Sequence, residues 1–279
     1  MVQLVFTEKP RSPLRKIVGV ASAAVFVALL IAASVSGVDR IQSSLIGAAP
    51  DAQDARCPQG MVAVSSGSGT FCIDTHEASP GSGCIYQDPK SGTETQVNLD
   101  QEGCTPVSQE GRMPWRFVSQ HEATLACAKA GKHLVTNKEW YAAALGTPEA
   151  ECGLAVSGNT AVATGTYERC RSSAGAIGMV GNAWEWVEGA ILDAAMNGRA
   201  FPGAGYVGAV DAEGLPLTTS ADAPNASFGS DYFWIEETGA QGIVRGGYWG
   251  SGNKGGVYAV YAASPPTFAG DAVGFRCAL

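Results

Sequence analysis

The sequence predicts an α+β domain that is irregular and rich in loops, with two packed helices and short antiparallel strands, preceded by one transmembrane helix. Three observations support this. The 279 residues include 36 glycines, which is typical of a chain with many turns. Two capping-box patterns lie in residues 119–146. Residues 17–38 carry no charge and are mostly Ala, Val, Leu and Ile.

The uncharged run 17–38 is long enough to span a bilayer as a helix. Residues 1–16 before it are basic, so the positive-inside rule predicts a cytoplasmic tail at 1–16 and an extracytoplasmic position for the rest. A retained signal anchor is favoured because the run exceeds a usual signal core. A signal peptide cleaved near Ser34–Ser36 stays open as an alternative. Residues 39–56, rich in Ala, Ser and Asp, are predicted to form a linker.

Charge and cysteine content restrict the class of protein. The net charge of −8 makes nucleic acid an improbable partner. A hydrophobic content of 46% excludes global disorder. The eight cysteines contain no Cys-x-x-Cys pair, so they are read as a set of disulfides rather than as a zinc site. Disulfides indicate an oxidising compartment, either the periplasm or the cell surface.

The first predicted elements of residues 57–279 are two strands around the Ser-Gly-Ser-Gly-Thr turn, formed by Cys57-Pro-Gln-Gly-Met-Val-Ala-Val and Phe71-Cys-Ile-Asp. Residues 78–107 are polar and turn-rich and are predicted to be irregular. Ser119 and Glu122 then form a capping box, which predicts a helix ending at Gly131. A second box, Thr136 with Glu139, predicts a helix ending at Gly146.

The second half of the chain is predicted to be mostly loop. Residues 151–178 read as a loop, and the fifty residues after Trp186 read as long surface loops because Gly, Pro and Asp are frequent there. Closing strands are predicted at residues 243–249, 257–262 and 273–279.

One stretch combines aromatic and acidic side chains: Gly178-Met-Val-Gly-Asn-Ala-Trp-Glu-Trp-Val187. In an extended chain Trp184 and Trp186 share one face and Glu185 points to the other. A carboxylate beside a Gly-Asn turn can join backbone carbonyls to bind a hard cation such as Ca²⁺. The alternative is that the tryptophans are core residues and Glu185 is solvated.

This stretch resembles the Gly-Asn-x-Trp-Glu-Trp signature of the formylglycine-generating enzyme, or sulfatase-modifying factor, family. Four further blocks follow the family's order, so the resemblance covers residues 57–279. They are Phe71-Cys-Ile-Asp-x-x-Glu77, Gly131-Lys-His-Leu-Val-Thr-Asn-Lys-Glu-Trp140, Val244-Arg-Gly-Gly-Tyr-Trp249 and Gly274-Phe-Arg-Cys277.

The resemblance implies a C-type-lectin-like fold and a structural Ca²⁺ site, which on this chain is formed by Val180, Gly181, Ala183 and Glu185. It also implies a disulfide between Cys127 and Cys277, because the family joins its first helix to the Gly-Phe-Arg-Cys end. Proximity in the sequence then suggests the pairs Cys57–Cys72, Cys84–Cys104 and Cys152–Cys170.

The oxidase members of the family bind Cu(I) through two cysteines after the Arg-Gly-Gly block. The matching positions here are Ser251 and Gly256, neither of which supplies a thiolate. Copper is therefore not expected, and no catalytic residue is assigned. The other metal-site and hydrolase patterns are missing too, since neither His-Glu-x-x-His nor Gly-x-Ser-x-Gly occurs.

The sequence thus favours a membrane-anchored extracytoplasmic pseudoenzyme that binds or scaffolds a protein, a peptide or a glycan. The residues expected to bind are Tyr248, Trp249 and Ser251, and the other exposed aromatic candidates are Tyr232, Phe233 and Trp234. One alternative is an active oxidoreductase that oxidises protein cysteines with atypical metal ligands. Another is a structural subunit of an envelope complex.

Overall fold

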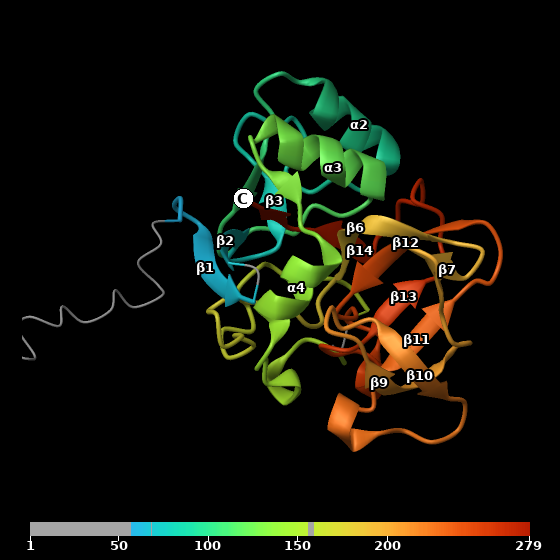
Figure 1. Ribbon diagram of the computed structural model, residues 1–279. Coiled ribbons are helices and arrows are strands. Elements are labelled where there is room, and N and C mark those ends of the chain that lie inside the picture. Colours follow the sequence, from blue (N-terminus) through green and yellow to red (C-terminus); the bar gives the residue numbers. More distant parts are fainter. Residues whose placement is uncertain (1–56, 68, 156–158) are drawn as a thin grey trace, which may run out of the picture. The chain divides into compact units, whose positions relative to one another are not determined.

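The computed structural model describes residues 57–67, 69–155 and 159–279. They form an α+β fold dominated by strands (Figure 1). Among these residues no helix is long and apolar enough to cross a membrane. The predicted tail at 1–16, span at 17–38 and linker at 39–56 lie outside the described residues.

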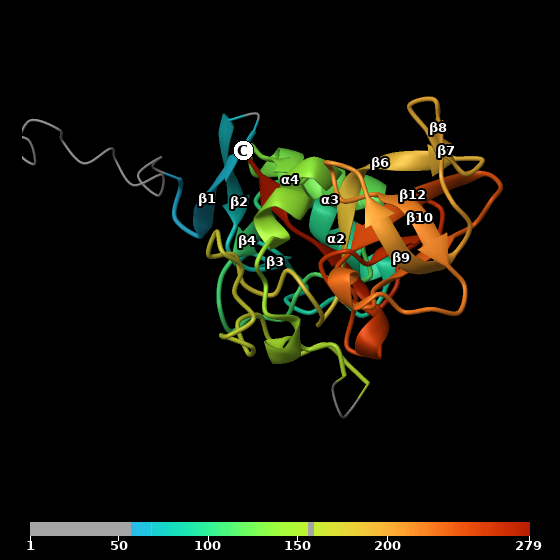
Figure 2. The ribbon, with the colours of Figure 1, turned by 60° about the horizontal axis from the view of Figure 1, so that its bottom comes forward.

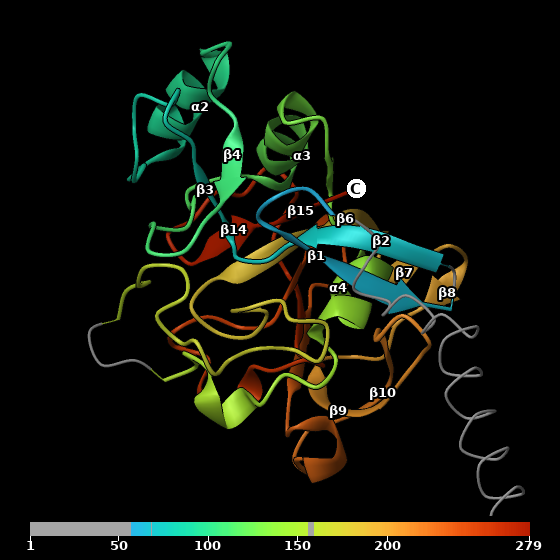
Figure 3. The same ribbon diagram turned by 90° about the vertical axis from the view of Figure 1, so that its left-hand side faces the viewer.

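The first sheet joins both ends of the described domain. The hairpin of β1 (Met61–Ser66) and β2 (Gly69–Asp74) forms as predicted, with Met61 opposite Asp74 and Ser66 opposite Gly69. The C-terminal strand β15 (Cys277–Ala278) lies between β2 and β5 (His133–Leu134). Figure 3 shows β1, β2 and β15 beside α4. A separate antiparallel pair is formed by β3 (Ala78–Pro80) and β4 (Pro106–Ser108).

Both predicted helices form, and their capping boxes are present. In α3 (Gln120–Lys129) the Ser119 hydroxyl accepts the Glu122 N–H, while the Glu122 carboxylate accepts the Ser119 N–H at 2.8 Å. In α4 (Asn137–Ala144) Thr136 and Glu139 do the same. Each pair satisfies N–H groups that the first helical turn leaves free.

The prediction of only two helices is wrong, because the described residues include a third, α2 (Gly92–Asp100), inside the stretch expected to be irregular. Ser91 caps it by accepting the Glu94 N–H. The sequence shows almost no apolar face for this helix, because two of its three buried residues, Thr95 and Asn98, are polar and only Leu99 is apolar. The buried polar side chains have partners: Asn98 donates to Tyr86 O at 2.8 Å, and Thr95 accepts from the Trp115 indole.

The expectation of loops after Trp186 is also wrong. This region contributes most of a large sheet whose order is β10–β9–β11–β13–β12–β6–β7–β8, with β14 paired to β6 (Figures 1 and 2). The strands are β6 (Trp184–Leu192), β7 (Ala195–Met196), β8 (Arg199–Ala200), β9 (Gly205–Val210), β10 (Pro216–Ser220), β11 (Tyr232–Ile235), β12 (Ala240–Arg245), β13 (Val260–Ala262) and β14 (Val273–Phe275).

These strands form because apolar residues scattered between the turn residues are buried together. Val187, Ile191, Val207 and Phe233 are all fully buried in one core cluster. Most neighbouring strands are antiparallel as predicted, but the pairs β11–β13 and β14–β6 are parallel. The described residues of the loop predicted at 151–178, which are 151–155 and 159–178, contain no α-helix and no long strand, and the short 3₁₀ turn η2 (Glu149–Glu151) lies at its start.

The described domain contains four disulfides, and no cysteine in it is free. They are Cys57–Cys72, Cys84–Cys104, Cys127–Cys277 and Cys152–Cys170, the same pairs that the sequence suggested. The Cys127–Cys277 bond joins α3 to β15 across 150 residues of sequence. Four disulfides are typical of a protein that folds in an oxidising, extracytoplasmic environment.

Candidate functional site

The Gly-Asn turn lies beside a buried network of charged side chains. Asn182 takes a left-handed backbone conformation with φ of 58° and donates its amide to the Glu77 carboxylate at 2.9 Å. Glu185 lies in β6, three residues after Asn182. It accepts two hydrogen bonds from the Arg276 guanidinium at 2.6 and 2.8 Å. It also accepts the Trp140 indole N–H at 2.6 Å. The residues that the family resemblance singled out are therefore brought together, and Glu185 is buried rather than solvated.

This geometry does not suit a Ca²⁺ ion at Val180, Gly181, Ala183 and Glu185. The single carboxylate of the set is used by Arg276 and Trp140, which are both hydrogen-bond donors. A divalent cation here would have to displace a guanidinium that is itself fully buried. Calcium at these four residues stays an untested prediction, and the donor set argues against it.

Glu77 is a second buried carboxyl group in this network. Burial raises the pKa of its carboxyl to about 8, and the nearby Glu185 carboxylate adds to the rise, while Arg276 and the Asn182 amide oppose it. In an unfolded chain the carboxyl has its ordinary pKa of 4.5. Between these two values the folded state binds more protons than the unfolded state, so the stability due to this group falls as the pH rises.

We expect Glu77→Gln to flatten the pH dependence of stability between pH 5 and 8. The wild type should lose roughly 1 kcal/mol per pH unit from this carboxyl as the pH rises, because one extra proton is bound in the folded state. Glutamine keeps a carbonyl oxygen for the Asn182 amide but binds no proton. Urea unfolding at several pH values measures the slope, with the exposed Glu188→Gln as control. Equal slopes for Glu77→Gln and wild type would contradict this assignment.

The two copper-ligand positions of the oxidases are differently occupied here. The Ser251 hydroxyl accepts the Tyr248 N–H at 2.9 Å within a tight turn. Gly256 is buried, and a Cβ placed on it would lie 2.3 Å from Oδ1 and 2.5 Å from Oδ2 of Asp231, and 2.5 Å from Oε1 of Glu149. A cysteine at 256 would thus collide with two carboxylates. No group of three or more His, Cys, Asp or Glu side chains in the described domain is arranged to bind a metal.

An aromatic cluster covers the other face of β6. Trp184 packs edge-on against Trp234 at 5.7 Å between ring centroids and stacks on Tyr248 at 6.4 Å. Tyr232 extends the cluster from Trp234 at 4.8 Å, and Tyr261 contacts Trp184 at 6.0 Å. Of the residues expected to bind, Tyr248 is half-buried and belongs to this cluster.

Two of the aromatic candidates are not exposed as expected. Phe233 is 0% exposed and Trp249 is 5% exposed, so both are core residues. Phe233 alternates with Tyr232 and Trp234 along β11 and therefore points to the opposite face of the sheet. Tyr232 and Trp234 remain partly exposed, in agreement with the expectation.

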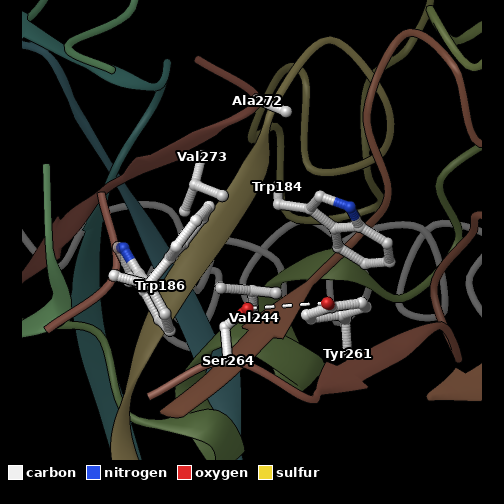
Figure 4. Close-up of a pocket in the computed structure, with 8 residues that line it drawn as sticks. Trp184, Trp186, Val244, Tyr261, Ser264, Ala272 and Val273 are labelled. Carbon is white, nitrogen blue, oxygen red and sulfur yellow. Dashed lines mark hydrogen bonds between the residues drawn. The ribbon is translucent and has the colours of Figure 1, made fainter. Parts of the chain in front are cut away.

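A pocket of about 190 Å³ opens beside the aromatic cluster (Figure 4). Trp184 and Trp186 both line it, as their shared face on β6 predicts, and Tyr261 lies opposite them. The other lining residues are Val244, Ser264, Phe268, Ala272 and Val273. The Ser264 hydroxyl donates to the Tyr261 hydroxyl at 3.5 Å, and the other side-chain polar atoms of the residues in Figure 4 are the two indole nitrogens. Phe268 is 43% exposed and lies at solvent.

Sequence reasoning missed most of this pocket. Only Trp184 and Trp186 stood out in the sequence, because they belong to a recognisable motif. Tyr261 lies in the strand predicted at residues 257–262 but was not singled out, and Ser264 and Phe268 follow that strand. They meet the tryptophans because β13 and the chain after it pack beside β12 and β6.

Comparison with known proteins bears on the same motifs. The model of the sulfatase-modifying factor enzyme 1-like domain matches residues 153–279, which include the Gly-Asn turn, both tryptophans, the Arg-Gly-Gly block and the Gly-Phe-Arg end. The predicted family resemblance is confirmed over residues 153–279. The matched residues 153–279 contain the pocket, Glu185, Arg276 and both positions that correspond to the copper ligands.

The solved structures that match this chain are distant from it in sequence. The Major Tropism Determinant P3c variant is 16% identical with a TM-score of 0.43, over 81% of this chain and 53% of that chain. This chain thus spans about half the length of that protein. PvdO from Pseudomonas aeruginosa is 18% identical with a TM-score of 0.44, over 75% of this chain and 80% of that chain. CarF is 14% identical with a TM-score of 0.39, over 75% and 86%. A search of curated proteins found no match.

Proposed function

We propose that this protein is a membrane-anchored, extracytoplasmic binding module of the sulfatase-modifying-factor type that does not carry out copper-dependent oxidation. Residues 17–38 supply the anchor in this proposal, and the domain at 57–279 supplies the binding surface on a C-type-lectin-like scaffold. The observation that carries the proposal is the apolar pocket beside the aromatic cluster in a domain without copper-binding thiols.

The absence of a copper site is supported by the chemistry of the side chains. Cu(I) prefers thiolate ligands, and all eight cysteines of the chain are bonded in disulfides. Ser251 offers a hydroxyl that is already bonded to the Tyr248 N–H, and Gly256 offers no side chain. The positions where the oxidases hold the metal therefore have neither the ligands nor the space for it.

The pocket is suited to a large apolar side chain of a polypeptide. Its walls are aromatic rings and aliphatic groups, which gain free energy when apolar surface leaves water. A glycan would need several convergent hydrogen-bonding groups, whereas this pocket offers mainly the Tyr261 and Ser264 hydroxyls. The ligand class proposed is thus a peptide or protein segment with an aromatic or aliphatic anchor residue.

Filling the pocket is expected to weaken ligand binding without unfolding the domain. Ala272 lies at the rim of the pocket and is half-buried, so Ala272→Phe would occupy the space (Figure 4). Peptides selected from a displayed random library on the purified protein should carry an aromatic or aliphatic residue. Their affinity should fall at least tenfold in Ala272→Phe, because a single buried anchor commonly contributes more than about 2 kcal/mol.

The matched control is Ala223→Phe, which adds the same side chain on an exposed loop. Peptides that bind both variants equally would contradict the pocket as the binding site, and selection of glycans instead of peptides would contradict the ligand class. A separate measurement tests the loss of oxidation: the protein is incubated with Cu(I) and a Cys-containing peptide. Stoichiometric copper with oxygen uptake would restore the oxidase alternative.

A further inference from the structure

Two carboxylates from distant parts of the chain meet at Gly256. Glu149 begins η2, just after α4, and Asp231 directly precedes β11. Oε1 of Glu149 accepts the Val257 N–H at 2.7 Å, and Oδ2 of Asp231 accepts the Tyr258 N–H at 2.7 Å. Two consecutive backbone amides thus hold the two carboxylates side by side.

The second oxygen of each carboxylate faces the same small space. Oδ1 of Asp231 is buried and has no hydrogen-bond partner among the described residues, and the whole Asp231 residue is 0% exposed. A Cβ placed on Gly229 would lie 2.7 Å from Oε2 of Glu149 and 2.9 Å from Oδ1 of Asp231. Gly229 itself is exposed, and Glu149 is half-buried, so the pair lies close to the surface of the domain.

Gly256 leaves room for the pair, because a Cβ there would lie 2.3 Å from Oδ1 of Asp231 and 2.5 Å from Oε1 of Glu149. Its φ is not in the left-handed region, so its backbone conformation does not require glycine. Its Cβ position lies within 2.5 Å of an oxygen of each carboxylate, so any side chain there would displace them. The absence of a side chain at 256 is thus a condition for the carboxylate pair.

Neither carboxylate forms a salt bridge within the described part of the chain. The fully buried Arg245 acts on Asp231 only at longer range, and its own hydrogen bonds go to Asn137, Gly214 and Val257. Two adjacent carboxylates in a partly desolvated site repel each other unless a cation or a proton lies between them. An unpartnered buried acceptor is costly for the same reason.

We propose that Glu149 and Asp231 bind a hard divalent cation, with Ca²⁺ as the best fit, through Oε2 and Oδ1. Ca²⁺ accepts irregular sets of oxygen ligands and keeps water in its remaining positions, as a site with two carboxylates requires. The ion ties together η2, the start of β11 and the turn at residues 256–258. It is separate from the Glu185 position that the family resemblance suggests.

The competing explanation is a proton shared by the two carboxyl groups. Burial raises the pKa of Asp231 to about 8, and the neighbouring Glu149 carboxylate adds to the rise. Burial also raises the pKa of Glu149. A measurement above pH 8 therefore favours the doubly ionised pair and gives the cation its best opportunity to bind.

The test is calorimetric titration of the purified full-length protein with Ca²⁺ at pH 8.5, after treatment with EDTA. One ion should bind per chain, and the melting temperature should rise by at least about 3 °C at saturation. Asp231→Asn and Glu149→Gln should each weaken binding at least tenfold. Both amides keep an oxygen for the backbone N–H groups, so the fold is expected to survive, and circular dichroism checks it.

Asp222→Asn is the matched control, because Asp222 is exposed in a neighbouring loop and should leave the affinity unchanged. Ca²⁺ binding that persists unchanged in Asp231→Asn and Glu149→Gln would overturn the proposal. The absence of any Ca²⁺ effect on the wild type at pH 8.5 would also overturn it, in favour of the shared proton. Both outcomes are independent of whether peptides bind the aromatic pocket.

Discussion

Arg276→Met is expected to destabilise the domain by about 3–5 kcal/mol, because it leaves the Glu185 carboxylate buried without its counter-ion. Arg276 is 0% exposed and Glu185 is 1% exposed. The guanidinium also donates to the backbone oxygens of Asp74, Ile177 and Gly178, so its loss leaves three carbonyl groups in two segments without this donor. Unfolding in guanidinium chloride measures the loss of stability. The domain can fall below the threshold for folding, and then soluble yield and resistance to proteolysis report the same effect.

The control for this prediction is Arg169→Met. Its guanidinium pairs with Glu151, but the side chain is 81% exposed, so its removal should cost no more than about 1 kcal/mol. The double variant Arg276→Met with Glu185→Gln should recover part of the loss, since the unpaired charge is gone. Equal stability of Arg276→Met and Arg169→Met would show that the buried pair is not what holds these segments.

Removing the Cys127–Cys277 disulfide is expected to have the second large effect. The two cysteines are 150 residues apart in the sequence, so their bond restricts the unfolded chain more than a short loop does. The chain-entropy relation gives about 5 kcal/mol for Cys127→Ala with Cys277→Ala. The same relation gives about 3 kcal/mol for the 15-residue separation of Cys57 and Cys72.

Denaturant unfolding of the two double-alanine variants measures this difference directly. The variant without Cys127–Cys277 should be less stable than the variant without Cys57–Cys72 by about 2 kcal/mol, with the wild type as reference. Both Cys127 and Cys277 are fully buried, so the small cavity left by alanine adds to the loss in that variant. An equal cost for the two pairs would mean that restriction of the unfolded chain is not the main contribution.

The sequence predicted those features whose cause is local. The capping boxes at Ser119 and Thr136 identified α3 and α4, because a cap needs only residues three positions apart. The turn between residues 64 and 71 identified the first hairpin. Alternation along β6 correctly placed Trp184 and Trp186 on one face with Glu185 on the other. The motifs within residues 153–279 also indicated the family whose model matches this part of the chain.

The sequence failed where elements depend on distant neighbours. Strands β7 to β11 are short and interrupted by Gly, Pro and Asp, and they exist because the neighbouring strand supplies their hydrogen bonds. Helix α2 buries Thr95 and Asn98, whose partners come from the segments around Tyr86 and Trp115. Phe233 and Trp249 were expected at the surface, but exposure is decided by what packs above a residue.

By itself, then, the sequence determined the capped helices, the first hairpin, the face of each tryptophan and the family resemblance, because each follows from residues close together in the chain. Tertiary structure alone decided which side chains meet. It pairs Glu185 with Arg276, places Tyr261 and Ser264 in the wall of the pocket, and brings Glu149 and Asp231 together at Gly256. The physical reason is that charge compensation and burial depend on distances in space, and these pairs are separated by tens of residues in the sequence.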